Sequence, residues 1–340
     1  MSTASEYREG VADPPVHPPD GSTGPPPTEL PTGLPPELPE EPEAARGSLV
    51  RGLVRLVRPH QWSKNAVVLV LPLLESGTAP WRAIGSALPV LVLFVLASSA
   101  TYVVNDLADR ERDRRHPVKR HRPIASGAVP VPAAIVLGAA LYLALLAGSA
   151  LVGGAAIPVL AYAVTNICYS FVLKHVSVVD VFVIAAGFVL RVCAGAMAAS
   201  VTTSSWFLLC VFSVCILLGF GKRRHELTSV QNGPSELHRP ALRAYSVPFL
   251  NSMVTFAASV TVLAYVSFLQ SDAAAGSMRQ LRILLSTPLA VFAIARYLQI
   301  LLVSEEGGEP TRTLFTDRTM LAVGGLWLTG FAVLLAVQSW

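Results

Sequence analysis

The sequence contains few charged residues for its length. Of its 340 residues, 14% are Asp, Glu, Lys or Arg, whereas a soluble domain averages about 25%. Hydrophobic residues make up 52% of the chain, and the mean hydropathy is +0.53. This composition argues against a soluble protein and favours one whose apolar surface faces lipid.

Two further patterns are missing. Alternation of apolar and polar residues with a period of two is absent, which argues against an outer-membrane barrel. The four cysteines have no CxxC or Cys/His spacing, so neither a metal site nor a disulfide is expected from them. The apolar residues instead form long uninterrupted runs, which predicts an all-α polytopic membrane protein.

The N-terminal block, residues 1–46, differs from the rest of the chain. It is rich in Pro, Glu, Gly and Ser and lacks the apolar core of a signal peptide. Such a segment cannot bury enough apolar surface to offset its ordering entropy. We expect a disordered Pro-rich cytoplasmic tail over 1–46, with a docking site for a partner that binds polyproline helices as the alternative. Residues 47–340 form the transmembrane domain.

Nine apolar segments follow the tail. The first is short for a full span of about 20 residues, so it is expected to begin earlier, within "RPHQW". The predicted spans are 65–77, 84–107, 133–152, 155–173, 178–200, 205–221, 247–269, 280–303 and 318–338.

Basic residues concentrate in alternate loops. One set of loops carries Arg51, the run 110–122, Lys174 and the run 222–243, whereas the other set contains few Lys or Arg. The positive-inside rule places the basic set in the cytoplasm. We therefore expect a multi-pass protein of the plasma (inner) membrane with its N-terminus and active site cytoplasmic and its C-terminus outside.

An acidic motif closes the second predicted span. Asp106, Asp109 and Asp113 are spaced i, i+3 and i+7, so they are expected to share one helix face, beside Asn105. These oxygen ligands suit Mg²⁺, which takes one or two carboxylates and completes its shell with substrate phosphates and water. The alternative is a solvated helix end with alternating charges.

Two features favour the site over the solvated helix end. The Asn-Asp pair directly follows "ASSATYVV", near bilayer depth, where polar groups are costly and usually functional. The adjoining "HPVKRHRPIASG" supplies His116, Lys119 and Arg122, which are suitable partners for phosphate.

Other cytoplasmic helix ends add polar and basic side chains to this region. For Lys222 and Arg223, the alternative is that they snorkel to the membrane surface, whereas Arg191 and Arg296 are flanked by apolar residues and are functional candidates. The further residues assigned to this group are Arg58, Gln61, Lys64, Asn65, Tyr169, Lys174, His175, Asp180 and Glu226.

These motifs resemble a known family. "NDLADRERDRRHPVKRHRPIASG", "RPHQWSKNAVVLVLPLL" and "YSFVLKHVSVVDVFVIAAGFVLRVCAGA" are similar to the UbiA superfamily of intramembrane prenyltransferases. Within it, they are most similar to the branch of actinobacterial decaprenyl-phosphate phosphoribosyltransferases. The resemblance covers about residues 50 to 340. Aromatic prenyltransferases of this superfamily carry a second, DxxxD motif where this chain has "GKRRHEL", with Glu226 as its only acid.

The resemblance implies nine transmembrane helices around a central cavity that opens to the cytoplasm. It also implies Mg²⁺-dependent transfer of 5-phosphoribose from phosphoribosyl pyrophosphate (PRPP) to a polyprenyl phosphate, with release of pyrophosphate, for cell-wall arabinan synthesis. Asn105, Asp106, Asp109 and Asp113 would be the catalytic and metal residues. The substrate-binding residues would be Lys64, Lys119, Arg122, Lys174, Arg58, Gln61, Tyr169, Arg191, Lys222, Arg223 and Glu226.

Two alternatives and one open question remain. A relative within the superfamily would move a prenyl group from a prenyl diphosphate to an aromatic or other acceptor. A transporter would show inverted repeats with helices broken at matching positions, and no convincing pair is found. The expected partners are PRPP, a polyprenyl phosphate and the bilayer, with no nucleic acid, and homo-oligomer formation is left open.

Overall fold

The computed structural model describes residues 49–75, 80–230, 240–271, 279–303 and 316–338. The predicted tail, residues 1–46, lies outside these ranges. The described residues contain no β-strand, which confirms the all-α fold class.

Eight long α-helices account for most of the described chain. Seven of them are long and apolar enough to cross a membrane, which supports a multi-pass membrane protein; the remaining one, α12, closes the series. The eight helices are α3 (Pro80–Ala108), α5 (Val131–Ser149), α6 (Ala156–Phe171), α7 (Val179–Ala198), α8 (Ser205–Val230), α9 (Val247–Gln270), α10 (Arg279–Leu302) and α12 (Arg318–Gln338).

The first predicted span, 65–77, is not one continuous α-helix. A short helix α1 (Leu49–Leu56) leads into a 3₁₀-helix η1 (Pro59–Leu69), which passes into a six-residue helix α2 (Val70–Glu75). A 3₁₀ run of 11 residues is long, because 3₁₀ hydrogen bonds have poor geometry. Its neighbours therefore have to stabilise it, and Gly195 allows the closest approach: a Cβ built there would lie 1.8 Å from the Val68 carbonyl oxygen.

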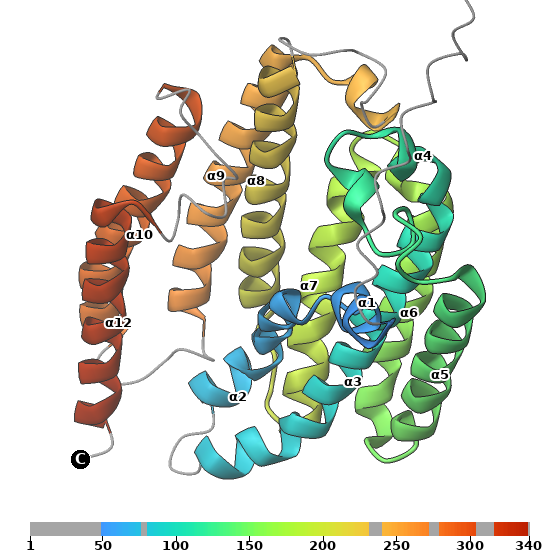
Figure 1. Cartoon of the computed structure of the whole chain (residues 1–340). Helices are drawn as coiled ribbons and strands as arrows, with labels where there is room; N and C mark the ends of the chain where they lie inside the picture. The colour runs from blue at the N-terminus through green and yellow to red at the C-terminus, as the bar shows by residue number, and fades with distance from the viewer. Residues whose placement is uncertain (1–48, 76–79, 231–239, 272–278, 304–315, 339–340) are drawn as a thin grey trace, which may run out of the picture. The chain divides into compact units, whose positions relative to one another are not determined.

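The helices pack mainly against their neighbours in sequence. Helix α3 contacts α5, α6, α7 and η1, so the segment that ends in the acidic motif is central to the N-terminal half (Figure 1). Helix α8 packs against α7 and α9, and α10 packs against α9 and α12. Phe94 of α3 meets Tyr162 of α6 edge-on, with ring centroids 5.3 Å apart.

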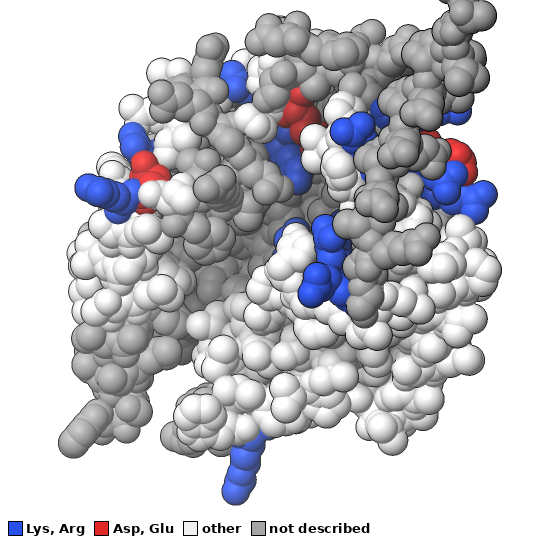
Figure 2. All heavy atoms as spheres, viewed as in Figure 1, with Lys and Arg blue, Asp and Glu red and all other residues white. Residues whose placement is uncertain are grey.

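Charged residues are unevenly distributed along the helices. Figure 2 shows Lys, Arg, Asp and Glu mostly at the end of the bundle where α4 lies in Figure 1, above a broad band of other residues. Large apolar side chains of the long helices remain exposed, among them Leu143, Leu284 and Leu328. An apolar surface this extensive is expected to face lipid.

Candidate active site

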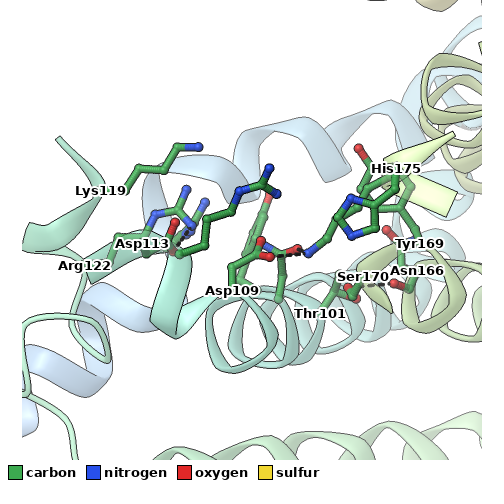
Figure 3. Close-up of a pocket in the computed structure, with 14 residues that line it drawn as sticks. Thr101, Asp109, Asp113, Lys119, Arg122, Asn166, Tyr169, Ser170 and His175 are labelled. Carbon is green, nitrogen blue, oxygen red and sulfur yellow. Dashed lines mark hydrogen bonds and ion pairs between the residues drawn. The ribbon is translucent and has the colours of Figure 1, made fainter. Parts of the chain in front are cut away.

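A polar cavity lies where the C-terminal ends of α3 and α6 meet the loops that follow them. It has about 860 Å³ of empty space, part of which is open to solvent. Five of its lining residues are Lys or Arg and two are Asp, so the lining carries an excess of positive charge. The lining residues are Arg58, Thr101, Tyr102, Asn105, Asp109, Arg112, Asp113, Lys119, Arg122, Asn166, Tyr169, Ser170, Lys174 and His175 (Figure 3).

The structure thus brings together nine of the residues that the sequence assigned to the site. Sequence reasoning missed Thr101, Tyr102, Arg112, Asn166 and Ser170. A signal for two of these was present, because Asn166 and Ser170 stand at helical spacing around Tyr169 on α6. The predicted residues in the lining are Arg58, Asn105, Asp109, Asp113, Lys119, Arg122, Tyr169, Lys174 and His175.

The acidic motif continues across a break between two helices. Helix α3 ends at Ala108, and Asp109 (φ −93°, ψ 0°) begins the short helix α4 (Arg110–Arg115). Asp106 and Asp113 both accept hydrogen bonds from Arg122 Nη1, at 3.1 and 2.7 Å. Arg122 thus joins Asp106 to Asp113 across this break, whereas Asp109 pairs with Lys174.

Asp106 is buried beneath the cavity. Its side chain is 2% exposed, and its Oδ1 accepts hydrogen bonds from Arg58 Nη2 (2.7 Å) and Arg122 Nη1 (3.1 Å). The other carboxylate oxygen, Oδ2, finds no hydrogen-bond partner among the described residues. Asp106 therefore anchors two guanidinium groups that line the cavity.

Asp109 is the aspartate most accessible from the cavity. Its side chain is 21% exposed, and its Oδ1 lies 2.6 Å from Lys174 Nζ. The same ammonium group donates to Asn105 Oδ1 at 3.3 Å. Two oxygens from the motif therefore converge on one cationic position.

Arg58 reaches the cavity from a left-handed backbone conformation. Its φ and ψ are 52° and 64°, a conformation that costs energy for a residue other than glycine. Its guanidinium carbon stands 4.8 Å from the Tyr102 ring centroid, and its Nη2 pairs with Asp106. Strain of this kind persists where surrounding contacts enforce it, and here the contacts come from α3.

The oxygens of Asn105 and Asp109 fit a hard divalent cation. Among the described residues, no group of three or more His, Cys, Asp or Glu side chains could hold a metal ion alone. A Mg²⁺ site needs only one or two carboxylates when the substrate supplies phosphate oxygens. The motif therefore fits a cation that binds together with a diphosphate, with Asn105 and Asp109 as the accessible ligands.

Arg191 is not in the cavity lining. It is 6% exposed, and its Nε donates to Asn65 Oδ1 (2.9 Å) and its Nη1 to the Gly187 carbonyl (2.9 Å). Its Nη2 donates to Tyr162 Oη (3.0 Å), and its guanidinium carbon stands 4.4 Å from the Tyr162 ring centroid. These neutral partners tie η1 to α6 and α7, so the contacts indicate a structural role.

Arg223 and Glu226 pair with each other at the end of α8. Arg223 Nη1 lies 2.5 Å from Glu226 Oε2, and Arg223 Nε lies 2.7 Å from Asp180 Oδ2. Asp180 is fully buried, and its Oδ1 accepts a hydrogen bond from Tyr245 Oη at 2.9 Å. None of these residues lines the cavity.

The remaining predicted residues also lie outside the cavity lining. Gln61 and Lys64 belong to η1, and Lys222 to α8. Arg296 pairs with Asp317 (2.8 Å), which accepts from the Met320 amide at the start of α12. This ion pair joins α10 to α12 and provides a structural reason for an arginine in an apolar helix.

His116 acts as a turn residue. Its Nδ1 accepts hydrogen bonds from the amides of Val118 and Lys119, at 3.2 and 3.4 Å. Burial and then the neighbouring Lys119 charge lower its pKa. The expected cationic phosphate partner is therefore a neutral hydrogen-bond acceptor.

The membrane-length helices and the polar cavity at the ends of α3 and α6 define a multi-pass membrane protein with a candidate site for an anionic substrate. Residues 66–321 match the UbiA prenyltransferase family, and the chain belongs to this family. A decaprenyl-phosphate phosphoribosyltransferase of Mycolicibacterium smegmatis is 33% identical over 83% of this chain and 91% of its own length. The protein of that name from Corynebacterium glutamicum is 32% identical, over 85% of this chain and 88% of its own.

A solved structure has the same fold. A UbiA homologue from Archaeoglobus fulgidus, bound to GPP and Mg²⁺, superposes with a TM-score of 0.62 at 16% identity. The match covers 85% of this chain and 100% of that protein. At this identity the likeness establishes the fold.

Proposed function

We propose that this protein transfers 5-phosphoribose from PRPP to a long-chain polyprenyl phosphate such as decaprenyl phosphate. The main support for this proposal is a cavity in a bundle of membrane-length helices. Five basic side chains line this cavity around Asn105 and Asp109. The mycobacterial and corynebacterial relatives support the assignment, because their names give this reaction class and they match most of the chain.

The charge of the cavity suits a donor with phosphate groups at both ends. In Figure 3, Lys119 and Arg122 lie to one side of Asp109, and Tyr169, Asn166 and His175 lie to the other. PRPP carries a pyrophosphate on C1 and a phosphate on C5, so both ends of the molecule need polar or cationic partners. The five basic residues of the lining, with polar side chains on both sides of Asp109, support such a donor more than a prenyl diphosphate, whose other end is a hydrocarbon.

Asn105 and Asp109 would hold Mg²⁺, whose chemistry when bound is Lewis-acid stabilisation of the departing pyrophosphate. The ammonium group of Lys174 would exchange its partner, from Asp109 to a phosphate oxygen, as the donor binds. Asp106 would keep Arg58 and Arg122 directed toward the donor through its two ion pairs. The protein's contribution is thus positioning together with electrostatic stabilisation.

The acceptor needs no protein nucleophile. An oxygen of the lipid phosphate, already an anion at neutral pH, forms a bond to C1 of the ribose. The bond from C1 to the pyrophosphate oxygen breaks, and its electron pair leaves with the pyrophosphate. The transition state is oxocarbenium-like, as in other glycosyl transfers, and no strong base is required.

The pairing of Glu226 supports phosphoribosyl transfer over prenyl transfer. Glu226 is the single acid in the segment where aromatic prenyltransferases carry a second acidic motif, and it pairs with Arg223, which also pairs with Asp180. The segment therefore offers one carboxylate where a second metal site of the DxxxD type would use two. The runner-up function, prenyl transfer to an aromatic or other acceptor, is therefore disfavoured.

The proposed topology places the cavity at the cytoplasmic face of the inner membrane. PRPP is water-soluble and made inside the cell, and the basic loops lie at the same end of the sequence-predicted spans as the cavity. In the proposed count of nine spans, η1 and α2 together form the first, the seven long helices from α3 to α10 form the next seven, and α12 forms the last.

The test compares two labelled donors. Membranes containing the protein receive either PRPP labelled in its 5-phosphate or a labelled prenyl diphosphate, together with Mg²⁺ and decaprenyl phosphate. The proposal predicts labelled lipid from PRPP alone, and at least about a hundredfold less from Asp109→Asn. Labelled product from the prenyl diphosphate alone would instead establish the runner-up function.

A further inference from the structure

The turn between Lys174 and α7 has an unfavourable backbone. Val178 has φ 68° and ψ −52°, and the Val179 amide donates to the Ser177 carbonyl at 2.8 Å. This is a three-residue γ-turn of the strained kind, and it is centred on a β-branched side chain. Such a conformation persists only where its surroundings enforce it.

The hydroxyl of Tyr245 contacts both sides of this turn. The Val178 amide donates to Tyr245 Oη at 2.5 Å, and Tyr245 Oη donates to Asp180 Oδ1 at 2.9 Å. Asp180 is fully buried and is also paired with Arg223. Tyr245 is itself 7% exposed, so water does not easily replace these bonds. Burial is the main reason that the pKa of Tyr245 is raised, which keeps its proton available for Asp180.

The turn is joined to the cavity through a short run of backbone. Lys174 lies in the 3₁₀-helix η4 (Leu173–His175), and the Val176 amide donates to the Leu173 carbonyl at 3.2 Å. The Val176 carbonyl in turn accepts from the Asp180 amide at 3.1 Å. A shift of the turn is therefore transmitted to the residue whose ammonium group meets Asp109 and Asn105.

We propose that Tyr245 is a positioning residue, which fixes Lys174 in the cavity by holding the strained turn at Val178. The inference rests on the proposed function of the cavity as a diphosphate site. Tyr245 does not line the cavity and lies 71 positions after Lys174 in the sequence, so it acts through the turn and has no direct contact with the donor. Neither the family match nor the relatives' names assign it a role.

The first experiment measures binding of magnesium pyrophosphate to the purified full-length protein in detergent. Tyr245→Phe removes one hydroxyl and both bonds, and affinity is expected to fall about tenfold. Tyr297→Phe is the matched control, because this tyrosine is 3% exposed and its hydroxyl finds no hydrogen-bond partner among the described residues. Its affinity should stay within about twofold of wild type.

A double-mutant cycle separates positioning from a general loss of stability. If Tyr245 acts through Lys174, then Tyr245→Phe has no further effect on pyrophosphate affinity in a Lys174→Ala background. If the two substitutions instead weaken pyrophosphate binding independently, their fold-losses in affinity multiply in the double variant, and this result would overturn the inference. Wild-type protein that fails to bind magnesium pyrophosphate would instead refute the proposed function. Wild-type binding with an unaffected Tyr245→Phe would refute the positioning role alone.

A third variant covers the case in which Tyr245→Phe does not fold. Glycine adopts positive φ without strain, so Val178→Gly reduces the need for the tyrosine. The Val178→Gly/Tyr245→Phe protein is expected to fold and to bind within about threefold of wild type. A double variant that binds as weakly as Tyr245→Phe, or that does not fold, would overturn the inference.

Discussion

Lys174 Nζ lies 2.6 Å from Asp109 Oδ1 across the cavity. The ammonium group occupies the place where the motif's accessible oxygens converge. A metal-bound diphosphate would bring a cation to Asp109 and phosphate oxygens to Lys174. Asp109 would then pair with the metal, and Lys174 with the phosphate, in place of their present ion pair. The ion pair thus fixes the polar groups that the donor would contact.

Asp106 and Asp109 are expected to respond differently to substitution. Asp109→Asn removes a cavity-facing ligand, so activity should fall at least about a hundredfold. The amide oxygen can still accept from Lys174, so the free energy of unfolding should change less than in Asp106→Ala. Asp106→Ala leaves Arg58 and Arg122 without their shared acceptor, and should cost about 2–4 kcal/mol of stability as well as activity. Lipid product formation and thermal unfolding in detergent measure the two effects. Equal stability of the two variants would contradict the anchoring role of Asp106.

The contact between η1 and α7 predicts an intolerant glycine. A Cβ at position 195 would lie 1.8 Å from the Val68 carbonyl oxygen, so Gly195→Ala must displace the backbone of η1. Overpacking of this kind costs about 3 kcal/mol or more. Gly85→Ala on α3 is the control, because a Cβ there meets nothing within 4 Å and alanine favours a helix. Matching unfolding temperatures for the two variants would show that η1 does not pack as described.

The contacts of Arg191 predict a loss of stability on replacement by lysine. A lysine cannot reproduce three directed hydrogen bonds or lie flat over the Tyr162 ring. Arg191→Lys is expected to cost about 2–4 kcal/mol, since Asn65 and Tyr162 lose buried partners. Pyrophosphate affinity per folded molecule should change by less than about threefold. A large change in affinity with unchanged stability would support the sequence-based assignment of Arg191 to substrate binding.

The ion pair between α10 and α12 predicts a dependence on acidity. Hydrogen bonding from Arg296, and then from the Met320 amide, lowers the pKa of Asp317. Its contribution to stability is thus fully present above the ordinary carboxyl pKa of about 3.9, and is lost as pH falls through the lower folded value. Hydrogen exchange in α10 and α12 should accelerate across that window in wild type. Asp317→Asn has no carboxylate at this position to titrate, so its exchange should not accelerate across the same pH window. An equal acceleration in both proteins would contradict the contribution of the Asp317 carboxylate to stability.

The long helices and the polar motif could be predicted from the sequence, because both depend on local patterns. Runs of apolar residues define α3 to α10, and the spacing of "NDLADRERD" pointed to the cavity. The break at Asp109 could not be predicted in this way. Nothing in the local pattern marks the end of α3 at Ala108, and the partners of the aspartates, Arg122 and Lys174, come from separate segments.

The roles of the buried arginines could not be predicted either. Apolar neighbours made Arg191 look functional, but its partners Asn65 and Tyr162 lie 126 and 29 positions away. The same holds for Tyr245, which meets Val178 across 67 positions and carried no sequence signal. Long-range pairing of single polar groups is a tertiary property, and one sequence does not encode it as a pattern.

The most direct measurement is an experimental structure of the protein with PRPP and Mg²⁺ bound. The account predicts a metal coordinated by Asn105 and Asp109 together with pyrophosphate oxygens, at about 2.1 Å. It also predicts Lys174 Nζ on a phosphate oxygen, no longer paired with Asp109. A donor bound elsewhere, with the Asp109–Lys174 pair intact, would contradict it.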